Sequence, residues 1–314
     1  MAGDDDLKRP SPSWMMVISK TARSLHGNDA TGMLLPLVLL AIGAALVLYA
    51  HIYAARDDLE IRNFLSMVLL TMVPVAFLEM RLFKCSDPVG LLFRFSPKVL
   101  MMHVSFMVLR LYALIEVRYA QRFFSSTAVV LFALGGVIGG FLLLPTFFDV
   151  QPWNVVRLFR EHWDVCIVGG LALGGAIVTE GLNVAFHTAS TMVMDVIDTT
   201  ALYLELMAFV PALWMVCRDM AFSAPSRPAV AVADARRRAV PFFAFLATFY
   251  VSEDIVAAVV QCFICPLASL GHLAHFLLLV DFAAFFLHHL YDQGSLEKMW
   301  GKVVDLFRDG WALV

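Results

Sequence analysis

The sequence has little charge and lacks the short signatures of soluble enzymes. Only 16% of its 314 residues are Asp, Glu, Lys or Arg, whereas a soluble domain has about 25%. No GxSxG, HExxH, P-loop or GxGxxG string occurs, which excludes the common nucleophile, zinc and nucleotide motifs. There is also no N-x-S/T sequon and no basic array for nucleic acid. We therefore predict a protein that is not an enzyme, needs no cofactor and binds no nucleic acid.

Cysteine is also scarce, with five in the chain. The string "CFIC" at 262–265 has CxxC spacing, but a zinc site needs a second pair of ligands and a redox motif needs a thioredoxin-like context. A disulfide is one interpretation, and we favour inert membrane cysteines. His272 and His275 in "HLAHF" also lack further ligands, so we predict no metal site and expect two interfacial histidines.

In place of charge the sequence has long apolar stretches. It is 61% hydrophobic, with 26 Phe and 16 Met and a mean hydropathy of +0.79. The stretches approach the roughly 20 residues that a spanning helix needs and lack the alternation of barrel strands. We predict an all-α integral membrane protein in the lipid bilayer, an eight-helix bundle. The predicted spans are 32–54, 63–83, 98–117, 126–147, 164–183, 193–217, 239–262 and 270–291.

Lys and Arg residues in the predicted loops give the orientation. With eight spans, 16 of them lie on one side of the membrane and 4 on the other. Cytosolic loops carry the excess of basic residues, so both termini are predicted to be cytosolic. The tails are 1–31 and 292–314.

Several ionisable residues fall inside the predicted spans, where desolvation makes each of them costly and therefore a functional candidate. Arg110 lies near the middle of "FSPKVLMMHVSFMVLRLYALIEV" at 95–117. Another helix or a ligand must supply its partner, because its own segment offers no well-placed acid.

The sixth span carries three acids. Asp195, Asp198 and Glu205 are spaced to share one helix face. Tyr203 lies on another face, and Pro211 predicts a kink. Further acids stand in the seventh span, within "SED", and in the last span at Asp281.

Two interpretations of these charges are open. In one, a polar network holds the bundle together, with Arg110 paired to Glu205 or Asp281. In the other, which we favour, a water-filled cavity binds a charged ligand or relays protons.

The segment "YLELMAFVPALWMV" at 203–216 closely resembles the fifth helix of the KDEL receptors, which retrieve proteins from the Golgi to the endoplasmic reticulum. Tyr203, Glu205 and Pro211 have that family's spacing. The twelve-residue step from Lys98 in "FSPK" to Arg110 resembles the family's second helix. Asp281 in "LLLVDFAAFF" resembles the aspartate of its last helix. The resemblance covers roughly 63–291 and leaves 32–54 as an extra N-terminal helix.

This resemblance implies the seven-helix architecture that KDEL receptors share with SWEET (PQ-loop) transporters. It further implies a receptor in the endoplasmic reticulum and Golgi membranes, with C-terminal peptides of lumenal proteins and vesicle coat proteins as partners. Arg110 would bind the peptide carboxylate, with Glu205 and Asp281 balancing charge. The other expected site residues are Tyr203, Asp198 and Asp195.

The chain departs from the family pattern after Arg110, where Leu111, Tyr112 and Ala113 replace the family's Tyr-Leu-Asp. The family's lysine-rich coat-binding tail is also missing. Two other functions therefore stay open: a PQ-loop-type small-solute transporter, with or without coupling to protons, and a structural membrane subunit.

Overall fold

The computed structural model of the chain is helical throughout its regular parts. It describes residues 29–53, 59–85, 87–120, 133–143, 160–186, 192–219, 241–263 and 265–292, and no strand occurs among them. The predicted all-α class is confirmed. Most of the predicted tails, 1–31 and 292–314, lies outside the described residues.

The described residues form a series of helices along the chain. Their bounds are α2 (Asp29–Tyr53), α3 (Leu59–Leu82), α4 (Pro88–Ala120), a helix at Ala133–Leu143, α7 (Trp163–Phe186), α8 (Met192–Leu206), α9 (Val210–Asp219), a helix at 241–250, the π-helix η1 (Val251–Ile255), α11 (Val256–Gln261) and α12 (Pro266–Asp292).

Six helical segments of the described chain are long and apolar enough to cross a membrane, as expected of a multi-pass membrane protein. They are Met33–Tyr53, Ile61–Leu82, Trp163–Leu182, Val193–Arg218, Pro241–Val260 and Pro266–Phe286. All six coincide with predicted spans. The other two predicted spans, 98–117 and 126–147, fall on α4 and on the helix at 133–143, which is shorter within the described residues. The count of eight stays a prediction.

The start of α4 corrects the sequence-based boundary. We expected a loop over 84–97, yet the helix begins at Pro88. Asp87 caps it, because its Oδ1 accepts a hydrogen bond from the Gly90 amide at 2.8 Å. Proline suits the first helical position because the amide hydrogen that it lacks would have no helical acceptor there. The charged Arg94 and Lys98 obscured this part of the helix in the hydropathy pattern.

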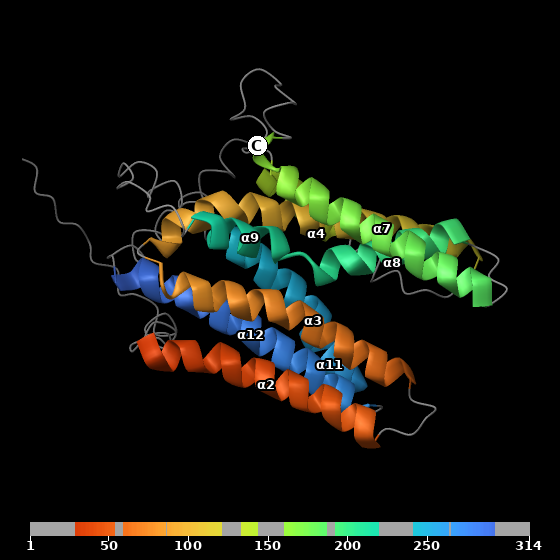
Figure 1. Ribbon diagram of the computed structural model, residues 1–314, viewed down its shortest axis with the longest axis horizontal. Coiled ribbons are helices and arrows are strands. Elements are labelled where there is room, and N and C mark those ends of the chain that lie inside the picture. The colour runs from red at the N-terminus through yellow and green to blue at the C-terminus, as the bar shows by residue number, and fades with distance from the viewer. Residues whose placement is uncertain are drawn as a thin grey trace, which may run out of the picture.

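The predicted kink in the sixth span is confirmed as a break between α8 and α9. Turns occupy 207–209, and Pro211 follows in the first turn of α9. Proline cannot donate to the carbonyl four residues before it. The chain tightens instead, since the amides of Ala208 and Val210 bond to carbonyls only three residues back. Figure 1 shows α8 and α9 as two separate segments.

Helices far apart in the sequence form two groups in the fold. The first and last described helices, α2 and α12, pack against each other and against α3, whereas α8 packs against α4 and α7. Figure 1 shows these as two sets of neighbouring rods, with α9 close to both α3 and α4. Phenylalanines fill much of the core between them; the fully buried ones are Phe95, Phe106, Phe242, Phe282, Phe285 and Phe286.

Candidate functional site

The first polar contact between helices joins α4 to α8. The guanidinium Nη1 of Arg110 donates to Oδ1 of Asp198 in an ion pair. Both side chains are accessible, at 38% and 51% exposure. The expected partners of Arg110, Glu205 and Asp281, do not fill this role. The pair therefore lies on an accessible part of the bundle instead of locking its centre.

Two more contacts join α7 to the same part of α8. The Thr199 hydroxyl donates to the Glu180 carboxylate at 2.5 Å, and the hydroxyls of Thr179 and Tyr203 lie 2.8 Å apart. All four residues are partly buried. We call these residues, together with Arg110 and Asp198, the outer polar face.

A second set of polar side chains lies deeper in the bundle. Both oxygens of Asp254 in η1 accept hydrogen bonds from α12, one from Nδ1 of His272 and one from Nδ1 of His275, each at 2.9 Å. The three residues are buried, at 3%, 8% and 6% exposure. Spacing of three places the two histidines on one face of α12. A buried carboxylate on another helix therefore holds both histidines, and their position at the membrane interface stays a prediction.

Glu253, the residue before Asp254, contacts a different helix. Its carboxyl group hydrogen-bonds to that of Glu205 on α8. Successive residues of a helix point in different directions, so the neighbours Glu253 and Asp254 reach α8 and α12 respectively. Arg110 is close enough to interact electrostatically with both glutamates.

Tyr250 and His103 extend this deeper set toward α4. Nε2 of His103 lies 2.8 Å from the Tyr250 hydroxyl, and its Nδ1 lies 2.8 Å from the Val99 carbonyl. A carbonyl only accepts, so Nδ1 carries the hydrogen and Nε2 of the neutral ring accepts from Tyr250. The Tyr250 ring also meets the His275 ring edge-on, with centroids 5.3 Å apart. We call Glu205, Glu253, Asp254, His272, His275, Tyr250 and His103 the inner polar cluster.

The π-helix is the local feature on which the inner cluster is built. It covers Val251–Ile255 and interrupts the helix that begins at Pro241. Single π-turns inside α-helices are rare and are frequent at functional sites. Here the π-turn carries both acids of the string "SED", which sequence reasoning noted without including them in the site.

A separate buried ion pair joins α4 to the start of α7. Lys98 Nζ donates to both oxygens of Asp164, at 2.6 and 2.7 Å, and to the Glu161 carbonyl at 2.9 Å. Its three donors are thus all used. Burial lowers the pKa of neighbouring His162, and the positive charge of Lys98 lowers it further. His162 is therefore neutral at pH 7 and leaves the pair undisturbed.

The remaining predicted site residues lie at different depths. Asp195 is partly buried one turn before Asp198 on α8. Asp281 is buried in α12, at 2% exposure, whereas Arg110 pairs with the accessible Asp198. Sequence reasoning missed Glu180 and His103 as site residues and left Glu253 and Asp254 outside the site. The acid pair inside an apolar run, followed by two histidines three residues apart, was the available signal.

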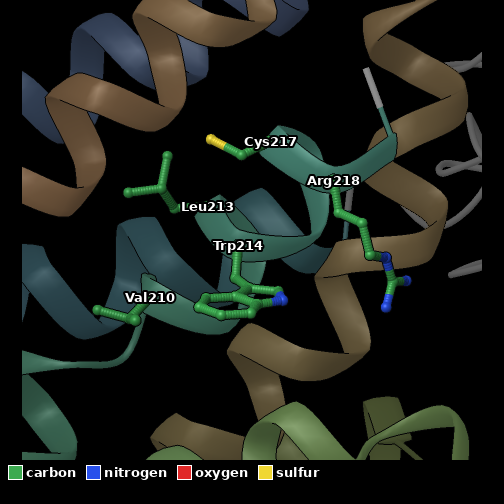
Figure 2. Close-up of a pocket in the computed structure, with 5 residues that line it drawn as sticks. All are labelled: Val210, Leu213, Trp214, Cys217 and Arg218. Atoms are coloured by element: carbon green, nitrogen blue, oxygen red, sulfur yellow. The ribbon is translucent and has the colours of Figure 1, made fainter. Parts of the chain in front are cut away.

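One surface depression of the described chain lies apart from both polar sets. It has a volume of about 530 Å³ and is lined by Val210, Leu213, Trp214, Cys217 and Arg218. Figure 2 shows all five side chains projecting from α9, with the large Trp214 ring in the middle. Trp214 is 63% exposed, and most of the lining is apolar, so this depression is an open part of the hydrophobic surface.

Comparison with known proteins adds no assignment. No family model, curated protein or solved structure matches this chain. Within the described residues, no group of three or more His, Cys, Asp or Glu side chains could hold a metal ion. The groups that define the chemistry of the site are an accessible guanidinium at the outer polar face, and carboxyl and imidazole groups in the inner polar cluster.

Proposed function

We propose that the protein is a multi-pass membrane receptor that binds ligands ending in a carboxylate at Arg110. The observation that carries the proposal is the accessible Arg110–Asp198 pair between α4 and α8. Exposed ion pairs contribute only about 0–1 kcal/mol, so a ligand carboxylate can replace Asp198 at little cost. Arginine suits this role because its planar guanidinium binds a carboxylate through two parallel hydrogen bonds.

The rest of the outer polar face supports a peptide as the ligand. Thr179, Thr199 and Tyr203 offer hydroxyl groups along α7 and α8, and hydroxyls can both donate to and accept from a peptide backbone. Together with the resemblance of 203–216 to KDEL receptors, this favours retrieval of lumenal proteins by their C-terminal signals. In this proposal the chain crosses the membrane eight times and both termini are cytosolic. The protein lies in the endoplasmic reticulum and Golgi membranes and has vesicle coat proteins as partners.

The test is the thermal stability of the detergent-purified protein with His-Asp-Glu-Leu and Lys-Asp-Glu-Leu peptides as free acids or amides. A ligand at 100 times its Kd stabilises the folded state by about 2.7 kcal/mol. We expect the free acids to raise the melting temperature of the wild type and the amides to leave it unchanged. The effect should vanish in Arg110→Gln and persist in Arg81→Gln, which removes an exposed arginine at the end of α3.

Two results would contradict the receptor proposal. Equal shifts of the melting temperature with free acids and amides would show that the protein does not recognise the carboxylate. A shift retained in Arg110→Gln would place the ligand elsewhere. A strong loss of stability in Arg110→Gln without any peptide effect would favour the structural subunit.

The second candidate is a small-solute transporter, and the observation that favours it is the inner polar cluster beneath the outer face. Polar groups continue from Asp198 to Glu205 on α8 and then to Glu253 on η1. Receptors that only bind at an accessible face do not need such an inner set. No shift with any peptide, combined with solute uptake into proteoliposomes that is lost in Glu205→Gln, would favour transport.

A further inference from the structure

The contact between Glu205 and Glu253 joins two acidic side chains and therefore requires a proton. Each glutamate is on a different element, α8 and η1, and their carboxyl groups hydrogen-bond to each other. An ionised carboxylate can only accept hydrogen bonds, so two carboxylates cannot form this contact. One of the two groups must carry a proton, as in paired acids that share one.

The surroundings of the pair do not supply enough positive charge to replace that proton. The charged and titratable groups that face it are Arg110 on α4, His275 on α12, and Asp254 and Tyr250 beside Glu253. Arg110 is already paired with Asp198, and His275 donates its Nδ1 hydrogen to Asp254. Asp254 adds a further negative group to the same region.

Burial makes a second ionised carboxylate costly at this place. Oε2 of Glu253 is closed off from solvent and has no hydrogen-bond partner within the described residues. A buried charge without a partner is expensive, whereas a protonated carboxyl group loses far less on leaving water. The contact between the two carboxyl groups therefore requires that the two glutamates together carry one negative charge and share one proton.

We propose that Glu205 and Glu253 form a proton-binding site that holds one proton in the ligand-free protein at neutral pH. Loss of this proton places two like charges side by side between α8 and η1. Arg110 interacts electrostatically with both glutamates, so proton loss draws its guanidinium away from Asp198 and toward them. The site stands on its own residues and does not depend on the identity of any ligand.

Infrared spectroscopy of the full-length protein in lipid nanodiscs tests the proposal directly. A protonated carboxyl group gives a carbonyl-stretch band that ionised carboxylates lack and that shifts in D₂O. Ordinary glutamates are ionised above about pH 5.5. We expect the wild type to keep such a band at about pH 7.5, and we expect Glu253→Gln and Glu205→Gln each to lose it.

The matched control is Glu180→Gln, which removes a partly buried glutamate that accepts its hydrogen bond from Thr199. Its band should equal that of the wild type. Asp281→Asn gives the second control, since Asp281 is another buried acid. A band that disappears only in Asp281→Asn would overturn the proposal.

Stability against pH gives a readout that is independent of the spectra. If the folded protein holds one proton that the unfolded chain has released, the unfolding constant rises about tenfold for each pH unit. Wild-type stability should therefore fall as the pH rises from about 5.5 to 7.5, relative to Glu253→Gln. The side-chain amide introduced by Glu253→Gln can donate to Glu205 without a titrating proton, so this dependence should be absent in that variant.

If one of the two glutamine variants does not fold, the other still tests the proposal. The wild-type spectrum alone can also overturn it. No D₂O-sensitive carboxyl band in the wild type at neutral pH would show that the pair holds no proton. A band or a pH dependence that is the same in wild type, Glu205→Gln and Glu253→Gln would place the proton elsewhere.

Discussion

Two basic residues of α4 lie in opposite surroundings. Lys98 is buried, and its ammonium group is fully bonded to Asp164 and the Glu161 carbonyl. Arg110, twelve residues later, is 38% exposed in its pair with Asp198. Removing one member of a buried pair leaves an uncompensated charge, whereas an exposed pair is screened by water. The Lys98 pair is therefore structural, and the Arg110 pair is free to exchange partners.

This contrast predicts different costs for similar substitutions. Lys98→Met should destabilise the protein by about 3–5 kcal/mol, and Arg110→Met by no more than about 1 kcal/mol. The measurement is thermal unfolding of the purified variants in detergent. The double variant Lys98→Met/Asp164→Leu should recover most of the loss, because the buried charge is then gone as well. Equal losses at Lys98 and Arg110 would contradict the distinction between the two pairs.

At the scale of elements, one glycine of the helix at 133–143 lets it approach its neighbours closely. A Cβ atom on Gly139 would lie 2.6 Å from Val104 on α4 and 3.2 Å from Phe245. A Cβ on the adjacent Gly140 would meet nothing within 4 Å. Small residues let helices approach closely in lipid, and Gly139 in the string "GGVIGG" does so here within the chain.

The two neighbouring glycines give a matched pair of variants. Gly139→Leu should force Val104 and Phe245 to move and lower stability by about 1–3 kcal/mol, the usual cost of overpacking. Gly140→Leu should be close to neutral. The melting temperatures of both variants in the same detergent decide this. If Gly140→Leu is the more damaging variant, then the open side of this helix is a contact surface after all.

For the molecule as a whole, the alternating direction of successive spans predicts on which side of the membrane each loop lies. Cys217 ends one span and Cys262 follows the next, and both are exposed. Consecutive spans cross in opposite directions, so the two cysteines belong on opposite sides.

A membrane-impermeant thiol reagent tests this arrangement in sealed vesicles of known orientation. The background replaces the other three cysteines, Cys85, Cys166 and Cys265, by serine, and each variant keeps either Cys217 or Cys262. We expect Cys217 to react only from the cytosolic side and Cys262 only from the opposite side. Reaction of both from the same side would rule out the predicted orientation of these spans.

The sequence by itself determined the class of the protein and the position of most helices. In lipid a helix satisfies its own backbone hydrogen bonds, so a long apolar stretch is enough to predict one. Six predicted spans coincide with apolar helices, and Pro211 located the break in the sixth span because its effect is local. Local signals failed at the start of α4, where Arg94 and Lys98 interrupt the apolar run.

Only the tertiary structure decided which charged groups meet. Arg110 and Asp198 are 88 residues apart in the sequence, and Asp254 is 18 and 21 residues from its two histidines. Such contacts depend on how each helix is rotated and how deeply it sits against its neighbours, and packing of all the helices together sets both. The sequence pattern showed Asp198 and Glu205 on one face of a helix. It could not show that Asp198 would contact an arginine and Glu205 another glutamate, because the packing of the neighbouring helices determines these partners.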